Sequence, residues 1–157
     1  MSKPVPNRVT ELLDEVRKLF HLAAQAAGEL HAGEPVTVST RAVLELLQRS
    51  GPATVPEIAR RRYVTRQHIQ TLVNDLLARG LVAAEANPAH RRSPRIALTA
   101  DGSRTIRRIT DRERRFLARL DLPVDPDALD HARDTLATLR AAIGALHEQQ
   151  RHPRQAS

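Results

Sequence analysis

The 157 residues have room for one domain of ordinary size, and 41% hydrophobic with 27% charged residues is a globular balance that argues against wholesale disorder. The chain has no cysteine, no apolar run near the ~18 residues of a membrane span and no apolar stretch at its N-terminus, which excludes thiolate and disulfide chemistry and predicts a cytoplasmic protein without a membrane partner. Its net charge of +7, from 25 Lys and Arg against 18 Asp and Glu, favours an anionic partner.

The first predicted element is a long amphipathic helix over residues 8–31, ended by Gly33 and Pro35. Its apolar side chains recur three or four positions apart, as they do along one face of a helix. They are Val9, Leu12, Leu13, Val16, Leu19, Phe20, Ala23, Ala24 and Ala27.

Two shorter helices are predicted next. The first has Thr37 or Ser39 as its N-cap and ends at Gly51. The second opens with Thr54-Val55-Pro56-Glu57, a capping box in which the threonine hydroxyl accepts from a first-turn amide and the glutamate accepts from the threonine amide. This helix is short and ends near Arg62.

A fourth helix is predicted between Thr65, its N-cap, and Gly80. Its apolar face consists of Ile69, Leu72, Val73, Leu76 and Leu77. After Gly80 the apolar residues no longer follow helical spacing, and the short segments 81–85 and 95–98 favour strands. The loop between these strands, residues 86–94, is basic and flanked by prolines, as in a hairpin tip. Thr99 then caps a helix over about residues 100–120.

The last predicted helix opens at Asp125-Pro126, an N-cap followed by a proline at the first helical position. Its apolar positions are spaced 3, 4, 3, 4 and 3 residues apart, a heptad seam of the kind that pairs helices. They are Leu129, Ala132, Leu136, Leu139, Ile143 and Leu146. A seam of this length is too apolar for a free monomer, which predicts a homodimer. Residues 151–157 are expected to be a frayed tail.

The order helix, turn, helix, two-stranded hairpin with a basic tip is that of a winged helix-turn-helix, which predicts double-stranded DNA as the partner. Residues 51–120 hold 15 Arg against 6 acidic residues, so this segment carries the whole positive excess. Gln and Asn pair with adenine edges and Arg with guanine. The expected DNA-binding residues are Thr65, Arg66, Gln67, His68, Gln70, Thr71 and Asn74 on the fourth helix and Arg91, Arg92 and Arg95 on the hairpin.

From Val36 to Gly102 the sequence resembles the MarR family of bacterial transcription regulators. The matching stretches are VTVSTRAVLELLQRSGPATVPEIARR, VTRQHIQTLVNDLLARGLV and NPAHRRSPRIALTADG. The resemblance implies a mainly helical fold with a small β-hairpin: one domain over residues 1–157, a winged-helix core at 36–102, and a dimerisation region at 8–31 and 103–150. The expected interface residues are Leu12, Val16, Leu129, Leu136, Leu139, Ile143 and Leu146.

The resemblance also implies function. Members of this family are homodimers, mostly repressors of pseudo-palindromic operators, and many are released by small phenolic or carboxylic effectors bound between the dimerisation region and the winged helix. Arg17, His21, His31 and Arg41 lie on helices that could border such a pocket, although each is more simply explained as a surface residue. The ligand, the target genes and the choice between repressor and activator stay open.

The sequence departs from the family pattern at four positions. His90 replaces an acid in the wing, Tyr63 a glycine in the turn before the recognition helix, Thr71 an arginine, and Arg62 an apolar residue. These departures leave the fold prediction intact and change the expected details of DNA contact.

Other classes of function fit less well. The sequence has no Gly-rich phosphate loop, no Gly-x-Ser-x-Gly elbow and no clustered histidines, so we expect no enzyme, no cofactor and no metal. With 3 aromatic residues in all, the core must be aliphatic, and an RNA-binding protein, which needs stacking platforms, is disfavoured. A non-specific nucleoid-type protein and a winged-helix interaction scaffold are the remaining alternatives. The arginines of residues 104–115 are expected to be surface residues or partners of Asp111 and Glu113.

Overall fold

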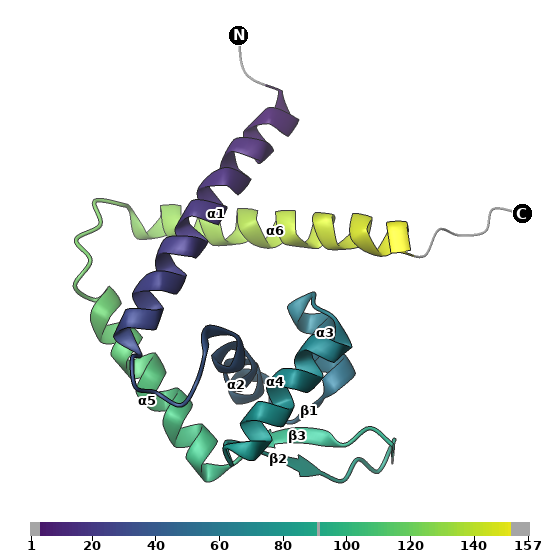
Figure 1. The fold of residues 1–157 in the computed structure, drawn as a ribbon. Coiled ribbons are helices and arrows are strands. Elements are labelled where there is room, and N and C mark those ends of the chain that lie inside the picture. Colours follow the sequence, from purple (N-terminus) through teal and green to yellow (C-terminus); the bar gives the residue numbers. More distant parts are fainter. Residues whose placement is uncertain (1–3, 91, 152–157) are drawn as a thin grey trace, which may run out of the picture. The chain divides into compact units, whose positions relative to one another are not determined.

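The computed structural model describes residues 4–90 and 92–151, so Arg91 and the tail beyond 151 lie outside the described residues. Its elements, shown in Figure 1, follow in the order α1 (Val5–Leu30), α2 (Val38–Ser50), β1 (Ala53–Thr54), α3 (Val55–Arg62), α4 (Arg66–Ala78), β2 (Val82–Glu85), β3 (Arg95–Leu98), α5 (Ala100–Leu117) and α6 (Pro126–Arg151). The chain divides into two compact units, Met1–Ala118 and Arg119–Ser157, and each is described by itself. The expectation of a single domain stays a prediction.

Threonine side chains cap α2, α3, α4 and α5, as the sequence predicted, whereas α1 begins after Pro4 without a side-chain cap. Thr54 and Glu57 form the expected capping box, with the Thr54 amide donating to Glu57 Oε2 at 2.7 Å. Thr65 caps α4 and Thr99 caps α5. At α2 the cap is Thr37, not Ser39, and it forms a second capping box with Thr40. Each box satisfies first-turn amides that no helix can satisfy internally.

A three-stranded antiparallel sheet of order β1-β3-β2 lies beside these helices. The predicted strands β2 and β3 are confirmed, with Ala83 opposite Ala97. The structure adds β1, which pairs Ala53 with Ile96 and was missed because two residues show no alternation. Leu81 does not belong to β2: its amide donates to Leu76 O at 3.0 Å and so completes the end of α4.

The core of the winged helix is aliphatic, as the sequence predicted. The largest fully buried side chains include Leu44, Ile58, Ile69, Leu76 and Ile106, which come from α2, α3, α4 and α5. All three aromatic residues are exposed. Because α4 places Ile69, Val73 and Leu76 in this core, the opposite face of the helix is held toward solvent.

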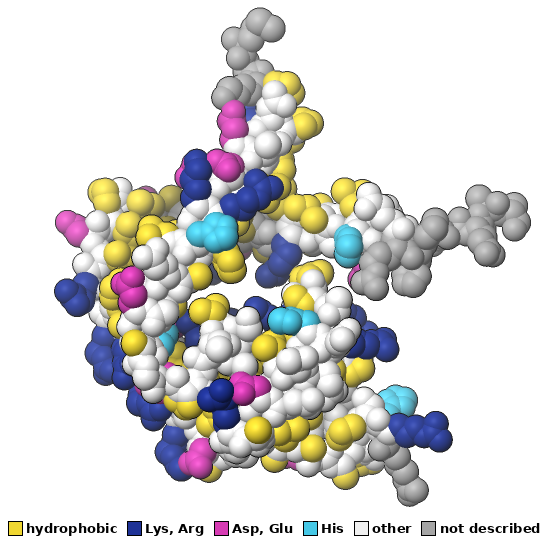
Figure 2. All heavy atoms as spheres, viewed as in Figure 1, with side chains coloured by type: hydrophobic (Ala, Val, Ile, Leu, Met, Phe, Trp, Pro, Cys, Tyr) yellow, Lys and Arg dark blue, Asp and Glu magenta, His cyan; other side chains and the backbone are white. Residues whose placement is uncertain are grey.

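Exposed large hydrophobic side chains lie along α1 and α6, where Figure 2 shows them in yellow, and others lie at the end of α5 and in the segment that follows it. In the second unit, the Asp127 amide donates to the Asp125 side chain at 2.9 Å, which confirms the predicted start of α6. α1 begins earlier and α5 ends earlier than the sequence predicted.

Candidate nucleic-acid interface

The outward face of α4 holds the predicted recognition residues, and all of them are exposed. Two pairs are engaged within the helix: Gln70 Nε2 donates to Asn74 Oδ1 at 2.9 Å, and Thr71 Oγ1 donates to Gln67 O at 3.1 Å. Within the described chain, the side chains of Arg66, Gln67 and His68 have no such partner. The first turn of α4 therefore presents the side chains that are most available to base edges.

The turn before α4 has an unusual backbone. Tyr63 lies in the left-handed region, with φ 56° and ψ 38°. The conformation is imposed by the end of α3, where the Val64 amide donates to Ala59 O at 3.1 Å and the Tyr63 amide to Arg60 O at 3.3 Å. This arrangement of bonds normally takes glycine at the Tyr63 position.

The wing between β2 and β3 is ordered by an asparagine. Asn87 Nδ2 donates to Ser93 O at 2.9 Å, and Asn87 Oδ1 accepts from the Ala89 amide at 3.2 Å. These bonds hold the loop without an acid at the His90 position. Arg92 is exposed at the tip, whereas Arg95 Nη2 donates to Pro52 O at 2.7 Å and so ties β3 to the segment before β1. Sequence reasoning found the basic wing and missed this tether.

A groove of about 610 Å³ lies between the start of α3 and the wing. Its basic lining side chains are Arg60, His90 and Arg95. Glu57 also borders the groove, but its carboxylate is bonded to Thr54, and the Thr54 amide holds the pKa of Glu57 below its ordinary value. The lining of the groove thus sets Arg60, Arg95 and His90 against the single carboxylate of Glu57, a basic balance that fits a phosphate backbone.

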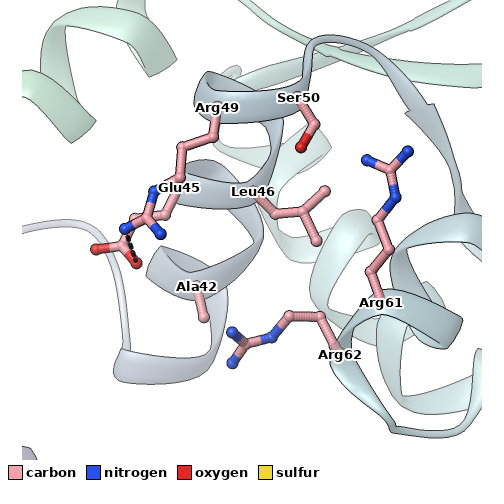
Figure 3. Close-up of a pocket in the computed structure, with 7 residues that line it drawn as sticks. All are labelled: Ala42, Glu45, Leu46, Arg49, Ser50, Arg61 and Arg62. Carbon is pink, nitrogen blue, oxygen red and sulfur yellow. Dashed lines mark ion pairs between the residues drawn. The ribbon is translucent and has the colours of Figure 1, made fainter. Parts of the chain in front are cut away.

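A second, smaller pocket of about 260 Å³ lies between α2 and α3. Arg49, Arg61 and Arg62 line it, yet Figure 3 shows their guanidinium groups pointing in different directions. Glu45 is already paired with Arg41 at 2.8 Å and approaches Arg49 at 3.9 Å. The pocket therefore offers no convergent set of donors.

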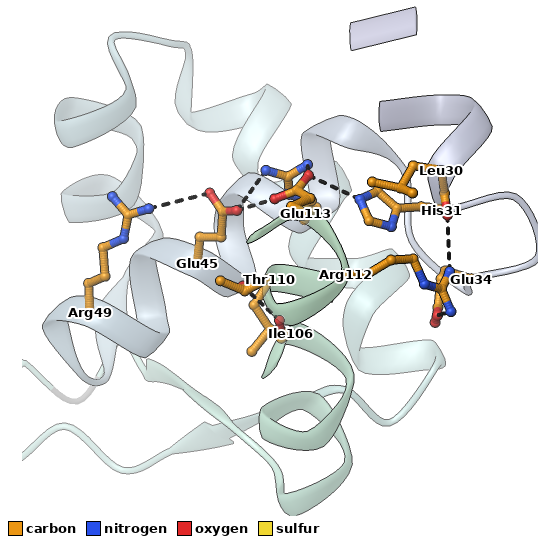
Figure 4. A network of polar contacts seen from close by, with 10 residues as sticks. Leu30, His31, Glu34, Glu45, Arg49, Ile106, Thr110, Arg112 and Glu113 are labelled. Carbon is orange, nitrogen blue, oxygen red and sulfur yellow. Dashed lines mark hydrogen bonds and ion pairs between the residues drawn. The ribbon is translucent and has the colours of Figure 1, made fainter. Parts of the chain in front are cut away.

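A network of polar contacts joins the end of α1 to α2 and α5 (Figure 4). His31 is 8% exposed, and its Nε2 lies 3.0 Å from Glu113 Oε1. Arg41 also binds Glu113. Glu34 binds Arg108 at 2.6 Å and Arg112 at 3.3 Å.

This network corrects two expectations from the sequence. His31 is a buried residue, and Arg41 is half-buried. Glu113 pairs with these two residues instead of the arginines of its own helix, whereas Asp111 does bind Arg114 at 3.0 Å as expected. Arg17 and His21, the other candidate effector residues, are exposed on α1.

Acid should weaken this junction through Glu34. Its side chain is 7% exposed, and the hydrogen bond from Arg108, followed by the charges of Arg108, Arg112 and His31, holds the pKa of Glu34 below its ordinary value of 4.5. A group with a lowered pKa stabilises the fold fully above its ordinary pKa and loses this contribution as the pH falls through the folded-state pKa.

Glu34→Gln should therefore lower the Tm by a few degrees at pH 7, corresponding to about 1 kcal/mol, and the difference from the wild type should shrink toward pH 3. Thermal unfolding at several pH values measures this. Asp75→Asn, which breaks the more exposed Arg79–Asp75 pair of 2.8 Å, is the control and should cost less at pH 7. If the Tm difference between Glu34→Gln and the wild type did not vary with pH, the lowered pKa of Glu34 could not be the source of this stability.

Among residues 4–90 and 92–151, no three His, Asp or Glu side chains are grouped to hold a metal ion, and no helix is long and apolar enough to cross a membrane.

The pair α3–α4, followed by the β2–β3 wing on a short sheet, defines a winged helix-turn-helix DNA-binding protein. A family model described as MarR family matches residues 34–93. An uncharacterized protein of Mycobacterium tuberculosis, Rv2011c, is 39% identical over 138 residues, covering 84% of this chain and 96% of that protein. The crystal structure of the MarR family transcription regulator SP03579 matches with a TM-score of 0.75 and 26% identity, covering 92% of this chain and 95% of that one.

The chain belongs to the MarR family of transcriptional regulators. The predicted fold class and family are thus confirmed, and the protein is a DNA-binding regulator, not an enzyme. A further structure, CouR from Rhodococcus jostii RHA1 bound to p-coumaroyl-CoA, has the same fold, with a TM-score of 0.72 and 23% identity over 88% of this chain and 95% of that one.

Proposed function

We propose that the protein is a homodimeric repressor that reads a pseudo-palindromic operator and is released by a small-molecule effector in the cytoplasm. The observation that carries this proposal is the exposed polar face of α4, together with the basic groove between α3 and the wing. A helix face supplies sequence readout, and a basic groove supplies affinity for the phosphate backbone.

Sequence choice is assigned to the first turns of α4. Arg66, Gln67 and His68 are free to reach base edges in the major groove. Gln70 and Asn74 are hydrogen-bonded to each other. To bind an adenine edge, one of them must break this bond, or the two amides must contact the base together while staying bonded to each other. Thr65, which accepts from the His68 amide at 3.2 Å, and Thr71 support this face.

Affinity without sequence choice is assigned to the wing, through Arg92 and its neighbour Arg91. Arg95 adds positive charge at the base of the wing, but its guanidinium is already bonded to Pro52 O. These cations would neutralise phosphates or enter a narrow minor groove.

The dimer is proposed to form through the apolar faces of α1 and α6. Leu12 of α1 and Leu129, Leu136, Ile143 and Leu146 of α6 are exposed, whereas Val16 and Leu139 are half-buried. Two-fold symmetry then places two copies of α4 on half-sites about 10 bp apart.

An effector is the least constrained part of the proposal. The ligand named for CouR, p-coumaroyl-CoA, is acidic and contains a phenol, and CouR shares this fold. For a carboxylate to reach Arg41 it would have to replace Glu113, which would also release His31. Such an exchange would couple ligand binding to the junction of α1, α2 and α5.

Two substitutions should separate readout from affinity. Gln67→Ala should weaken binding to the operator by about 1–3 kcal/mol and leave random duplex nearly unchanged. Arg92→Ala should weaken binding to both duplexes and lower the slope of log K against log salt by ~1 per subunit. Titration of both variants against the duplex upstream of the chain's own gene and a scrambled duplex, at two salt concentrations, measures the contrast.

The same titration tests the rival function. Equal losses on operator and scrambled DNA for Gln67→Ala would mean that α4 does not read sequence. The protein would then be a non-specific nucleoid-type winged-helix protein, and RNA that competes as well as duplex DNA would point to RNA binding.

A further inference from the structure

We propose that Tyr63 contacts DNA, with its phenol hydroxyl donating a hydrogen bond to a backbone phosphate at the edge of the major groove that α4 enters. The inference rests on the proposed function. It adds to the binding surface a residue of the helix-turn-helix turn that lies outside both α4 and the wing.

The backbone at Tyr63 disfavours any side chain. Its φ of 56° is the only positive φ of a non-glycine residue in the described chain. The left-handed region brings Cβ too close to the following carbonyl oxygen, so the end of a helix such as α3 normally takes glycine there. Tyrosine thus destabilises the fold at this position relative to an unstrained residue.

Contacts of the Tyr63 side chain within the protein do little to offset this conformational strain. Tyr63 is 59% exposed. No hydrogen bond or ring contact involves its side chain among residues 4–90 and 92–151. Strained residues that persist at a surface are concentrated at binding sites. The compensating contact is therefore expected in a complex.

Position and charge identify the partner. Tyr63 lies two residues before the N-cap Thr65 and three before Arg66, the first residue of α4. Because the N-terminal end of a recognition helix points into the groove, the turn before it runs beside the phosphate backbone. Arg62 and Arg66 flank Tyr63 and are exposed, so the local field attracts a phosphate. A tyrosine hydroxyl is a common donor to phosphate oxygens.

Two variants of Tyr63 separate the backbone from the hydroxyl. Tyr63→Gly should raise the Tm by about 1–4 °C, because relief of the strained φ outweighs the larger chain entropy of glycine in the unfolded state. It should nevertheless weaken binding to duplex DNA roughly tenfold. Tyr63→Phe keeps the strain and the ring, so its Tm should equal that of the wild type while its affinity falls by a similar factor.

The experiment measures thermal unfolding and affinity for the duplex upstream of the chain's own gene and for a scrambled duplex. A phosphate contact predicts equal fold-losses on the two duplexes. If Tyr63→Gly is less stable than the wild type, the side chain is compensated within the fold and the inference is overturned. If both variants bind as the wild type does, the inference fails while the proposed function stands. If the wild type binds neither duplex, both fail together.

Discussion

Gly102→Ala is expected to destabilise the protein by about 3 kcal/mol, or on the order of 10 °C in Tm. Gly102 is buried in the first turn of α5. A Cβ at this position would overlap the Leu81 carbonyl oxygen and lie 2.9 Å from the Leu81 carbonyl carbon and 3.3 Å from Leu98 Cδ2. The nearest obstacle is backbone, so no rotamer change can relieve the overlap.

The backbone at Leu81 has little freedom to move away. The Leu81 carbonyl accepts from the Thr99 amide at 3.2 Å, and Thr99 Oγ1 donates to Gly80 O at 2.7 Å while accepting from the Gly102 amide at 3.0 Å. These bonds join the end of α4 to the start of α5. A shift of Leu81 would break them and tilt α4, so DNA affinity should fall together with stability.

Gly28→Ala is the matched control for this prediction. Gly28 lies within α1, and a Cβ there meets no atom within 4 Å. Alanine should stabilise the helix by about 0.5–1 kcal/mol relative to glycine. Thermal unfolding of the two variants compares the same chemical change at a crowded site and at an open one. Similar Tm values for Gly102→Ala and the wild type would show that the α4–α5 junction yields easily.

Local signals explain which parts of the fold could be predicted. The caps at Thr54, Thr65 and Thr99 and the periodicity of α4 depend on residues only a few positions apart, so they could be predicted from the sequence alone. The pairing of β1 with β3 and the Arg95 tether to Pro52 join residues more than 40 positions apart. No periodicity or capping pattern records such contacts.

The candidate site divides in the same way. The recognition face of α4 followed from helical spacing, because burial of one face fixes the other outward. The partners of Glu113 could not be predicted in this way, because His31 and Arg41 reach it from segments 82 and 72 residues away in the sequence. In the sequence, Tyr63 stands where related proteins usually have glycine, but the left-handed backbone at this position is seen only in the structure.

Ile143→Glu is expected to convert a dimer into a monomer. In α6, Leu129 is 52% exposed, Leu136 39%, Ile143 46% and Leu146 59%. They repeat with the spacing of a heptad seam along a helix of 26 residues. Proteins that are monomeric in solution rarely leave a contiguous apolar stripe of this kind in water, so a second copy of the chain is the expected cover. A carboxylate at Ile143 would have to be buried unpaired in that interface.

Light scattering at micromolar concentration measures the effect, and Ala141→Glu is the control. Ala141 is exposed two positions from Ile143, which places it on the opposite side of α6, so the same charge should leave the dimer intact. A monomeric wild type, or an Ile143→Glu variant that remains dimeric, would remove α6 from the interface. Loss of the dimer should also weaken operator binding by about 100-fold or more. In a dimer, binding of one copy of α4 to its half-site holds the second copy close to the other half-site, and separate monomers lose this advantage. A monomer that kept full operator affinity would mean that one copy of α4 and its wing carries all of the recognition.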